Sequence, residues 1–391
     1  MFIVNEVRIE KWVYGGDGLA RIDDGRVVLA PYVLPGELAR VEVQKDIHAD
    51  LMEILEPAPE RVAPPCPHFG ACGGCQYQHA PYEFQLARKI EILREQLRRV
   101  GKLSYEGEIG VVSAEPLAYR NRAQFHIAGE KIGFRAARSH HLVALAGDCP
   151  ISSPRLNQAL AMIRERLPDK RFPRFVSSIE IFTNERDVQI NVLEYERPVA
   201  KTFYEWMEST VALNYPTRFG AFRVSPRSFF QVNRFLIEAL ADAALQNAEG
   251  KSALDLYSGV GLFARPLTEK FETVTAVEAG ASAVRDLEVN VPKARAEHAR
   301  VEDYLARLNI PAPDQAPDFV LADPPRAGLG KSVVAHLNRL APPRITIVSC
   351  DPATLARDLA GLREYTIEKL TLVDLFPQTY HLETVARLLR K

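Results

Sequence analysis

Four of the five cysteines in this 391-residue chain are spaced like ligands of one metal centre. Three follow the pattern C-x5-C-x2-C and the fourth comes later in a Gly-Asp-Cys-Pro segment, giving the set Cys66, Cys72, Cys75 and Cys149. Four thiolates suit either zinc or an iron–sulfur cluster, and spacing alone does not separate the two. His68 and His79 are possible substitute ligands if zinc is bound. The pattern predicts a metal centre within residues 66–149.

The fifth cysteine, Cys350, follows an apolar stretch at 345–349, and Asp323 follows another at 319–322. Residues just past the carboxyl ends of neighbouring strands in an open α/β sheet converge on one crevice, so both side chains should lie near a bound cofactor. A cysteine at a strand end is usually buried and inert. Here prolines stiffen both loops, and a helix beginning after Pro352 would place its N-terminus near the thiol and favour the thiolate. We therefore predict that Cys350 is reactive.

A glycine-rich turn follows the expected strand at 253–256 and precedes a helix. Gly259 and Gly261 let the backbone approach a ligand, and Glu278, at the end of the next strand, could accept hydrogen bonds from ribose hydroxyls. The same geometry serves nicotinamide dinucleotides and S-adenosylmethionine, so the motif does not separate these cofactors. A purely structural turn is the third interpretation.

The segments that must position these residues differ in character along the chain. Residues 1–58 predict a small closed barrel of the oligonucleotide-binding type, with strands at 7–13, 19–22, 26–30, 38–43 and 51–55. A proline-rich linker leads to the cysteines, and residues 82–100 have the apolar spacing of a helix, which we expect to pack on the last domain. The rest of domain 59–220 is expected to be mixed α+β, with elements at 121–127, 156–166 and 178–184.

Residues 221–391 alternate between helix and strand. A helix is expected over 229–245, and strands are expected at 253–256, 273–278, 319–322, 345–349 and 367–374. This alternation predicts a Rossmann-like, doubly wound α/β domain.

The composition excludes several classes of protein. Hydrophobic residues make up 47% and charged residues 25% of the chain, which excludes disordered, collagen-like and disulfide-scaffold proteins. No apolar stretch approaches the roughly 20 residues that span a bilayer, and the first residues lack the features of a signal peptide. We therefore expect no membrane partner and a location in the reducing cytoplasm, where the cysteines are thiols or ligands.

Charge is distributed unevenly along the chain, although the net charge is only −1. Residues 1–58 contain 6 Lys and Arg against 11 Asp and Glu, whereas residues 88–174 contain 17 against 9. A basic stretch between less basic ends is a plausible contact for a phosphate backbone, and Arg98, Arg99 and Arg120 to Arg122 are its candidate residues.

These motifs together resemble the RNA (uracil-5-)-methyltransferase family, specifically its iron–sulfur members with an N-terminal TRAM domain, a small RNA-binding barrel. The resemblance covers essentially the whole chain. Besides the motifs above, it rests on Tyr-Arg-Asn-Arg at 119–122, Gly-Phe at 133–134, Ser-His at 139–140, Ser-Phe-Phe-Gln-Val-Asn at 228–233 and His-Leu-Glu at 381–383. Two positions depart from the family pattern: Leu262 stands where many members have Asn, and Arg122 where Lys is usual.

The resemblance implies roles for individual residues. Cys350 matches the nucleophile and Glu383 the base, and the ligands of a four-iron four-sulfur cluster match Cys66, Cys72, Cys75 and Cys149. Contacts to S-adenosylmethionine are implied for Gln231, Tyr257, Gly259, Gly261, Glu278 and Asp323. Contacts to the target base are implied for Phe229, Asp323 and Arg326. Gly261→Val should then weaken cofactor binding without unfolding the protein.

The implied chemistry explains why a thiol and a carboxylate are both needed. Carbon 5 of uracil is a poor nucleophile, so a thiolate adds to carbon 6, and after methylation a base removes the proton from carbon 5. The barrel and the cluster favour 23S ribosomal RNA as the target, with the tRNA T-loop as the alternative, and we expect a monomer. Two hypotheses of other classes are an NAD-dependent oxidoreductase and a noncatalytic RNA-binding protein.

Overall fold

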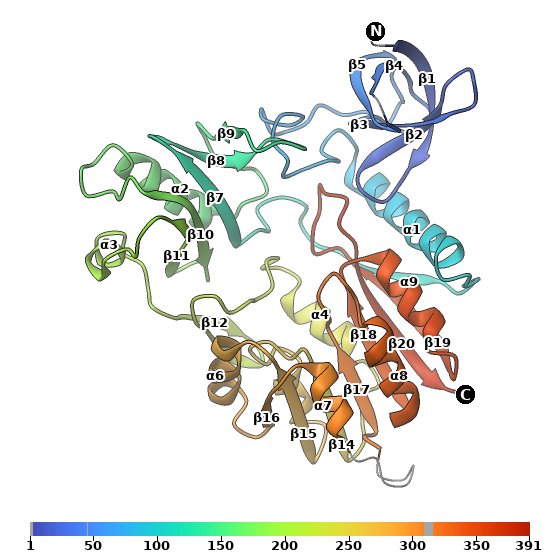
Figure 1. The fold of residues 1–391 in the computed structure, drawn as a ribbon, viewed down its shortest axis with the longest axis vertical. Coiled ribbons are helices and arrows are strands. Elements are labelled where there is room, and N and C mark those ends of the chain that lie inside the picture. The colour runs from blue at the N-terminus through green and yellow to red at the C-terminus, as the bar shows by residue number, and fades with distance from the viewer. Residues whose placement is uncertain (1–2, 45, 309–315) are drawn as a thin grey trace.

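The computed structural model describes residues 3–44, 46–308 and 316–391, and Figure 1 shows how its three parts are arranged. The N-terminal part is a five-stranded antiparallel sheet in the order β3-β2-β1-β4-β5. An isolated bridge between Leu29 and His48 joins β3 to the residue before β5, so the sheet curls on itself. The five predicted strands are all present, as β1 (Ile3–Trp12), β2 (Asp17–Arg21), β3 (Val27–Pro31), β4 (Leu38–Val43) and β5 (Ala49–Glu56).

The central part is built on a second antiparallel sheet, in the order β11-β10-β7-β8-β9. Its members are β7 (Arg122–Ala128), β8 (Lys131–Arg135), β9 (Leu142–Ala144), β10 (Val176–Thr183) and β11 (Val188–Tyr195), with the helices α2 (Pro154–Arg166) and α3 (Lys201–Trp206). A separate hairpin, β12 (Leu213–Thr217) and β13 (Gly220–Val224), leads into the last part. The elements predicted at 121–127, 156–166 and 178–184 are therefore confirmed, and the sequence analysis missed the strands between them.

The C-terminal part is an eight-stranded sheet in the order β16-β15-β14-β17-β18-β20-β19-β6. Its strands are β6 (Ile109–Val112), β14 (Ser252–Leu256), β15 (Thr273–Glu278), β16 (Arg295–His298), β17 (Phe319–Ala322), β18 (Arg344–Ser349), β19 (Tyr365–Val373) and β20 (Glu383–Arg390). Strands β14 to β18 run parallel, whereas β20 is antiparallel to both of its neighbours. Strand β6 comes from the segment assigned to the central domain, so that segment also contributes to the last sheet.

Helices cover both faces of this sheet, as the doubly wound prediction requires. One face is packed by α4 (Ile237–Ala244), α5 (Ala264–Leu267) and α6 (Ala281–Asn290). The other is packed by α7 (Val301–Arg307), α8 (Gly330–Leu340), α9 (Pro352–Gly361) and α1 (Tyr82–Arg99). No helix in the described ranges is long and apolar enough to cross a membrane.

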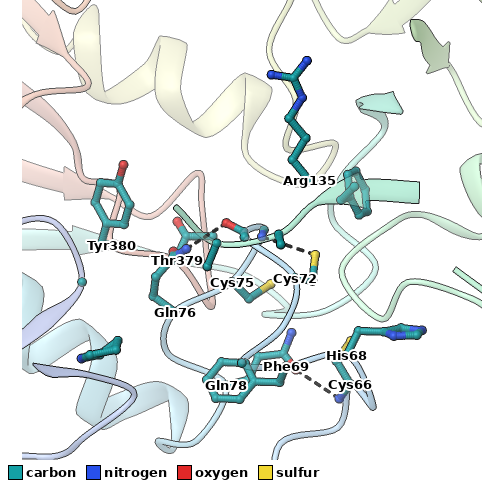
Figure 2. Close-up of a pocket in the computed structure, with 18 of the residues that line it drawn as sticks. Cys66, His68, Phe69, Cys72, Cys75, Gln76, Gln78, Arg135, Thr379 and Tyr380 are labelled. Atoms are coloured by element: carbon teal, nitrogen blue, oxygen red, sulfur yellow. Dashed lines mark hydrogen bonds between the residues drawn. The ribbon is translucent and has the colours of Figure 1, made fainter. Parts of the chain in front are cut away.

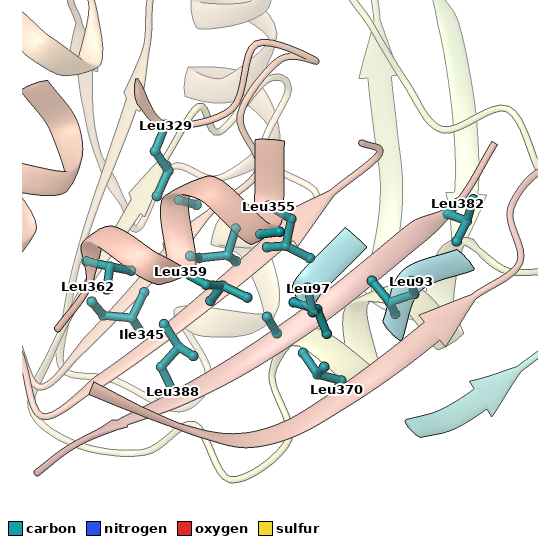
Figure 3. Close-up of a cluster of buried hydrophobic side chains, with 14 of the residues drawn as sticks. Leu93, Leu97, Leu329, Ile345, Leu355, Leu359, Leu362, Leu370, Leu382 and Leu388 are labelled. Atoms are coloured by element: carbon teal, nitrogen blue, oxygen red, sulfur yellow. The ribbon is translucent and has the colours of Figure 1, made fainter. Parts of the chain in front are cut away.

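Helix α1 belongs to the core of the C-terminal part, although it lies far from it in the sequence (Figure 3). Leu93 and Leu97 lie beside Leu355 of α9 and Leu370 of β19, and all four side chains are at most 1% exposed. Burying a leucine of this kind contributes about 1.5–3 kcal/mol, so this contact joins the two segments firmly.

The helix predicted over 229–245 is wrong in its first half, because α4 begins only at Ile237. The backbone before it is used by the central part instead. The amide of Asn121 donates to the carbonyl oxygen of Val232 at 3.0 Å, and Arg120 forms a bridge with Asn233. These contacts hold the backbone in an extended path beside residues 120–121, so residues 229–236 form a loop.

Candidate active site

Cys350 and Glu383 come together at the end of one antiparallel strand pair. Ser349, the last residue of β18, pairs with Thr384 of β20. Cys350 follows Ser349 and Glu383 precedes Thr384, so the two residues occupy matching positions on neighbouring segments. Glu383 is 5% exposed and Cys350 is half-buried. The sequence analysis expected Glu383 beyond the last strand, but it is the first residue of the unpredicted β20.

Asp323 joins this pair from the end of β17, the other neighbour of β18. Burial raises the pKa of the Asp323 carboxyl from 3.8 to about 7. Burial, and then the charge of Asp323, raises the pKa of Glu383 well above its usual value. Two buried carboxyl groups whose charges repel each other resist being ionised together, so the pair tends to keep a proton.

The thiol of Cys350 is surrounded by groups that oppose its ionisation. Burial raises its pKa to about 12, Glu383 and Asp323 add to the shift, and Arg326 lowers the pKa. Burial and the two carboxyl groups thus count against the expectation that the start of α9 favours the thiolate. At that helix start, Oδ1 of Asp351 accepts hydrogen bonds from the amides of Ala353 at 3.0 Å and Thr354 at 2.8 Å.

The glycine turn after β14 is held by a carboxylate on the next strand. The amide of Gly259 donates to Oε2 of Glu278 at 2.9 Å, and the amide of Gly280 donates to Oε1 at 2.6 Å. Tyr257 takes a left-handed conformation, with φ +61°, to start the turn. A Cβ atom at Gly259 would meet nothing within 4 Å. The turn thus leaves space beside a carboxylate that can accept further hydrogen bonds, which fits a nucleoside with ribose hydroxyls.

Gly261 has a different reason for being glycine. Its φ is +96°, and an added Cβ would come within 2.9 Å of Cδ1 of Leu287 on α6 and 2.5 Å of Cγ2 of Val291, the residue after that helix. This glycine permits close packing of the turn on the helix, so Gly261→Val should disturb the fold. This geometry counts against the expectation that the substitution spares folding.

Gln231 and Phe229 lie on the loop between β13 and α4. Phe229 is 61% exposed, which leaves it free to contact a substrate, whereas Phe230 is 2% exposed and belongs to the core. Gln231 is buried. Sequence reasoning missed the residue that holds this loop, which is Asp286 of α6. Its fully buried carboxylate accepts hydrogen bonds from the hydroxyls of Ser225 at 2.7 Å and Ser228 at 2.8 Å.

A second residue missed in the sequence links this loop to the glycine turn. The side-chain amide of Asn290 donates to the carbonyl oxygens of Arg223 at 3.0 Å and Val260 at 2.9 Å. The only signal in the sequence is that polar residues occupy the buried side of helix α6. Asp286 and Asn290 therefore fix two loops of the candidate site relative to each other.

The four predicted ligand cysteines line one cavity of about 780 Å³. Figure 2 shows three of them, Cys66, Cys72 and Cys75. Their thiols interact electrostatically, and burial raises the pKa of Cys75 to about 12. Within the described residues, no three His, Cys, Asp or Glu side chains are arranged to hold a single metal ion. The same cavity is lined by Tyr32 of the N-terminal sheet and by Arg326 and His381 of the catalytic part. It thus connects the cysteines with the Cys350 region.

The basic stretch is only partly available to a phosphate backbone. Arg122 is 8% exposed and binds the Glu180 carboxylate and the Ser228 carbonyl oxygen, each at 2.8 Å, so the expected contact of Arg122 with RNA is wrong. Arg120 does line the cavity. It is joined there by Arg135 and Arg138, two cations that the sequence analysis did not single out.

Comparison with known proteins agrees with this architecture. The family model of tRNA (uracil-5-)-methyltransferases matches residues 210–391. An Aquifex aeolicus protein described as an uncharacterized RNA methyltransferase is 34% identical over 98% of both chains. The 23S rRNA (uracil(1939)-C(5))-methyltransferase RlmD of Halomonas elongata is 31% identical over 97% of this chain and 88% of its own.

A solved structure is similar over its full length. The tRNA (uracil-54, C5)-methyltransferase of Pyrococcus abyssi, in complex with S-adenosyl-L-homocysteine, superposes with a TM-score of 0.76 at 25% identity and covers 100% of both chains. These matches favour a methyltransferase over the NAD-dependent oxidoreductase. With the thiol, the carboxylates and the glycine turn at one edge of the sheet, they show that the chain belongs to the family of RNA (uracil-5-)-methyltransferases.

Proposed function

We propose that this enzyme methylates carbon 5 of a specific uridine in 23S ribosomal RNA through a covalent adduct with Cys350. The matching positions of Cys350 and Glu383 on β18 and β20 carry the proposal, because the reaction needs a nucleophile and a base at one carbon–carbon double bond. The RlmD relative supports the choice of ribosomal RNA. The P. abyssi structure supports the T-loop of tRNA as the second candidate.

S-adenosylmethionine is the proposed methyl donor, and when bound it supplies an electrophilic methyl group. Glu278 would bind the ribose hydroxyls, since its carboxylate is already oriented by two backbone amides. The open side of Gly259 would admit the nucleoside. The remaining proposed contacts are Tyr257, which starts this turn, and Gln231 and Asp323, which lie on other loops.

The proposed chemistry uses Cys350 first and Glu383 second. The Cys350 sulfur, as the thiolate, bonds to carbon 6, and the π electrons move through carbon 5 onto the carbonyl oxygen. These electrons return through carbon 5, which bonds to the methyl group while the bond from that group to the sulfonium sulfur breaks and S-adenosylhomocysteine leaves. Glu383 removes the proton from carbon 5, the double bond forms again, and the sulfur leaves carbon 6 with its electron pair. A base whose pKa is raised by burial holds that proton well, which suits this last step.

The uridine must leave its stack to reach this site, at a cost of a few kcal/mol. Phe229 is exposed and would stack on the extruded base. Arg326 and Asp323 lie beside Cys350 and would contact the polar edge of the uracil. Arg120, Arg135 and Arg138 would hold the phosphates in the connected cavity.

The proposed cofactor of the cavity is a four-iron four-sulfur cluster, bound by Cys66, Cys72, Cys75 and Cys149. Four thiols around one cavity suit this donor set, because a cluster keeps its ligands around a body larger than a single ion. The chain would use the group to shape the RNA-binding loops, and none of the proposed methyl-transfer steps involves it.

A methyl-transfer assay tests the function. Purified protein is incubated with S-adenosylmethionine carrying a tritiated methyl group and with unmodified 23S rRNA or unmodified tRNA transcripts. We expect 5-methyluridine at one position in the ribosomal transcript. Label in the tRNA T-loop alone would move the target to the second candidate, and label on neither RNA would contradict the proposed function.

A further inference from the structure

The N-terminal sheet is joined to the catalytic part through the core and at the surface. Trp12 is 2% exposed and belongs to the same hydrophobic core as α9 and β18. Its ring stacks on Tyr77, with centroids 4.0 Å apart and planes inclined by 2°. Lys11 forms an ion pair with Glu95 of α1 at 2.6 Å. The end of β1 is therefore fixed relative to Cys350, because the N-terminal sheet packs directly on the catalytic part.

The turn that follows β1 reaches two loops of the catalytic site. The hydroxyl of Tyr14 donates to Oδ2 of Asp351 at 3.1 Å, and its ring meets the edge of Tyr380 with centroids 5.8 Å apart. Asp351 is the residue after Cys350, and Tyr380 precedes Glu383 by three residues. At Gly16, a Cβ atom would come 2.9 Å from Gln76 and 3.3 Å from Tyr380, so the turn fits closely against this wall.

The two carboxylate oxygens of Asp351 accept hydrogen bonds from different parts of the chain. Oδ1 caps α9 by accepting from the amides of Ala353 and Thr354, whereas Oδ2 accepts from Tyr14. One carboxylate thus joins the start of the helix to the N-terminal sheet, and Cys350 lies directly before it. The backbone of Asp351 is also held by the hydroxyls of Ser349 and Thr354, so the Tyr14 hydroxyl supplies the contact from the N-terminal sheet.

We infer that Tyr14 is a positioning residue, which holds the Cys350 loop for attack on the base. The inference rests on the proposed function, since it assumes that Cys350 is the nucleophile. It also assigns a role to an acidic sheet whose charge does not favour RNA. A small misplacement of a reacting atom lowers the rate without weakening the binding of substrate, so the effect of Tyr14 should fall on kcat.

Tyr14→Phe in the full-length protein tests this inference, because it keeps the ring on Tyr380 and removes only the hydroxyl. We expect kcat on the methyl-accepting transcript to fall about threefold to tenfold, with KM for RNA and for S-adenosylmethionine within about twofold of the parent values. The matched control is Tyr365→Phe, which removes a hydroxyl that donates to the Pro342 carbonyl oxygen at 2.9 Å, away from the site. That variant should keep its kcat.

A double-mutant cycle tests whether Tyr14 affects kcat through Asp351. If Tyr14 acts through Asp351, adding Tyr14→Phe to Asp351→Ala should lower kcat no further. Unchanged kcat in Tyr14→Phe, or a rise in KM for RNA that accounts for the whole loss, would overturn the inference. Alkylation of Cys350 by iodoacetamide, followed by peptide mass spectrometry, gives a readout without RNA, and its rate should change in Tyr14→Phe but not in Tyr365→Phe. If Cys350→Ala still methylates RNA, the proposed function fails, whatever Tyr14 does.

Discussion

Cys350 and Glu383 occupy matching positions on two neighbouring antiparallel segments, at the end where β18 and β20 separate. The carboxyl group of Glu383 is close enough to raise the pKa of the Cys350 thiol. Antiparallel pairing brings opposite residues within about 5.5 Å, so two groups 33 positions apart in the sequence can act on one small molecule. The proposed nucleophile and the proposed base are therefore separate residues, and each can be substituted without changing the other.

Glu383→Gln should trap the reaction after methyl transfer. Addition and methylation do not need the carboxylate, but without it the carbon 5 proton stays and the sulfur cannot leave. Turnover should fall by about 10²- to 10⁴-fold, and a methylated RNA–protein adduct should survive denaturing electrophoresis. Cys350→Ala is the matched control, which should form no adduct while binding RNA and cofactor normally. Normal turnover of Glu383→Gln would show that Glu383 is not the base.

The thiol of Cys350 should ionise only at high pH in the free enzyme, because burial and the neighbouring carboxyls raise its pKa to about 12. Only the thiolate is alkylated, so its rate of modification should rise about tenfold per pH unit from pH 7 to 10. Arg326→Gln should slow the reaction at every pH, since Arg326 lowers the pKa. The rate is measured by peptide mass spectrometry, with urea-unfolded protein as the reference. A plateau near pH 8 in the folded enzyme would contradict this prediction.

The two glycines of the turn should respond differently to substitution. Gly259→Ala places a methyl group in open space, at a conformational cost of about 1 kcal/mol, and should weaken the binding of S-adenosyl-L-homocysteine in calorimetry. Gly261→Val should instead lower the melting temperature, because its side chain overlaps Val291 and Leu287. Unchanged affinity of Gly259→Ala would remove that glycine from the cofactor site.

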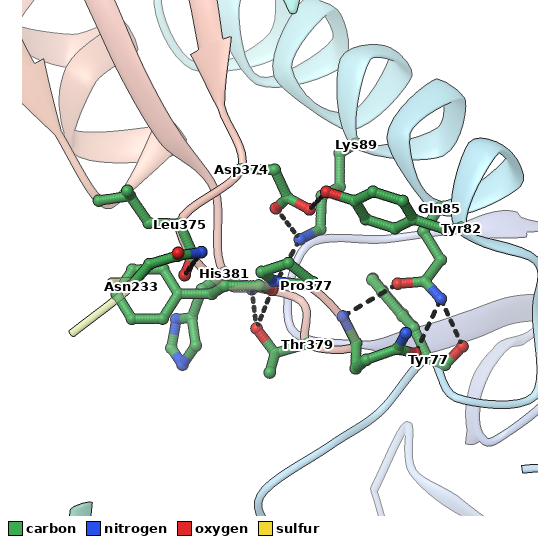
Figure 4. Close-up of polar contacts among 12 residues, drawn as sticks. Tyr77, Tyr82, Gln85, Lys89, Asn233, Asp374, Leu375, Pro377, Thr379 and His381 are labelled. Carbon is green, nitrogen blue, oxygen red and sulfur yellow. Dashed lines mark hydrogen bonds and ion pairs between the residues drawn. The ribbon is translucent and has the colours of Figure 1, made fainter. Parts of the chain in front are cut away.

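The buried ion pair between Lys89 and Asp374 should dominate the attachment of α1 (Figure 4). Lys89 Nζ lies 2.6 Å from Oδ1 of Asp374 and donates to the Phe376 carbonyl oxygen at 3.0 Å, with both charged side chains fully buried. Lys89→Met leaves the buried Asp374 carboxylate with the Tyr82 hydroxyl but without its cationic partner, and should cost about 3–5 kcal/mol of unfolding free energy in urea. Arg8→Ala, which breaks an exposed pair with Glu56, should cost less than about 1 kcal/mol.

Anaerobically purified protein should be brown and should contain about four iron atoms and four sulfides per chain, as expected for a four-thiolate cluster. Cys149→Ser should reduce iron content and RNA affinity while leaving S-adenosyl-L-homocysteine binding unchanged, because the cavity and the glycine turn are separate. Iron, sulfide and zinc are measured by chemical analysis on the same samples. A colourless protein with one zinc per chain would show that the four cysteines bind zinc and not an iron–sulfur cluster.

Local patterns in the sequence determined much of the fold. Strands such as β15 and β17 were predicted with their observed bounds, because a short apolar run between turn residues has few other conformations. The start of helix α4 was not predictable in this way. Residues 229–236 carry an apolar pattern that fits a helix, but hydrogen bonds to Tyr119 and Asn121, more than 100 positions away, hold them in a loop.

The candidate site, too, could be predicted only in part from the sequence. Cys350, Asp323 and Glu278 could be chosen from the sequence because residues after parallel strands share one edge of a sheet. The ionisation of Cys350 could not be predicted from the sequence, since it depends on the burial of the thiol and on which charged groups surround it. Contacts such as Tyr14 with Asp351 join residues 337 positions apart. No local pattern encodes them, because they exist only when separate parts of the chain pack together.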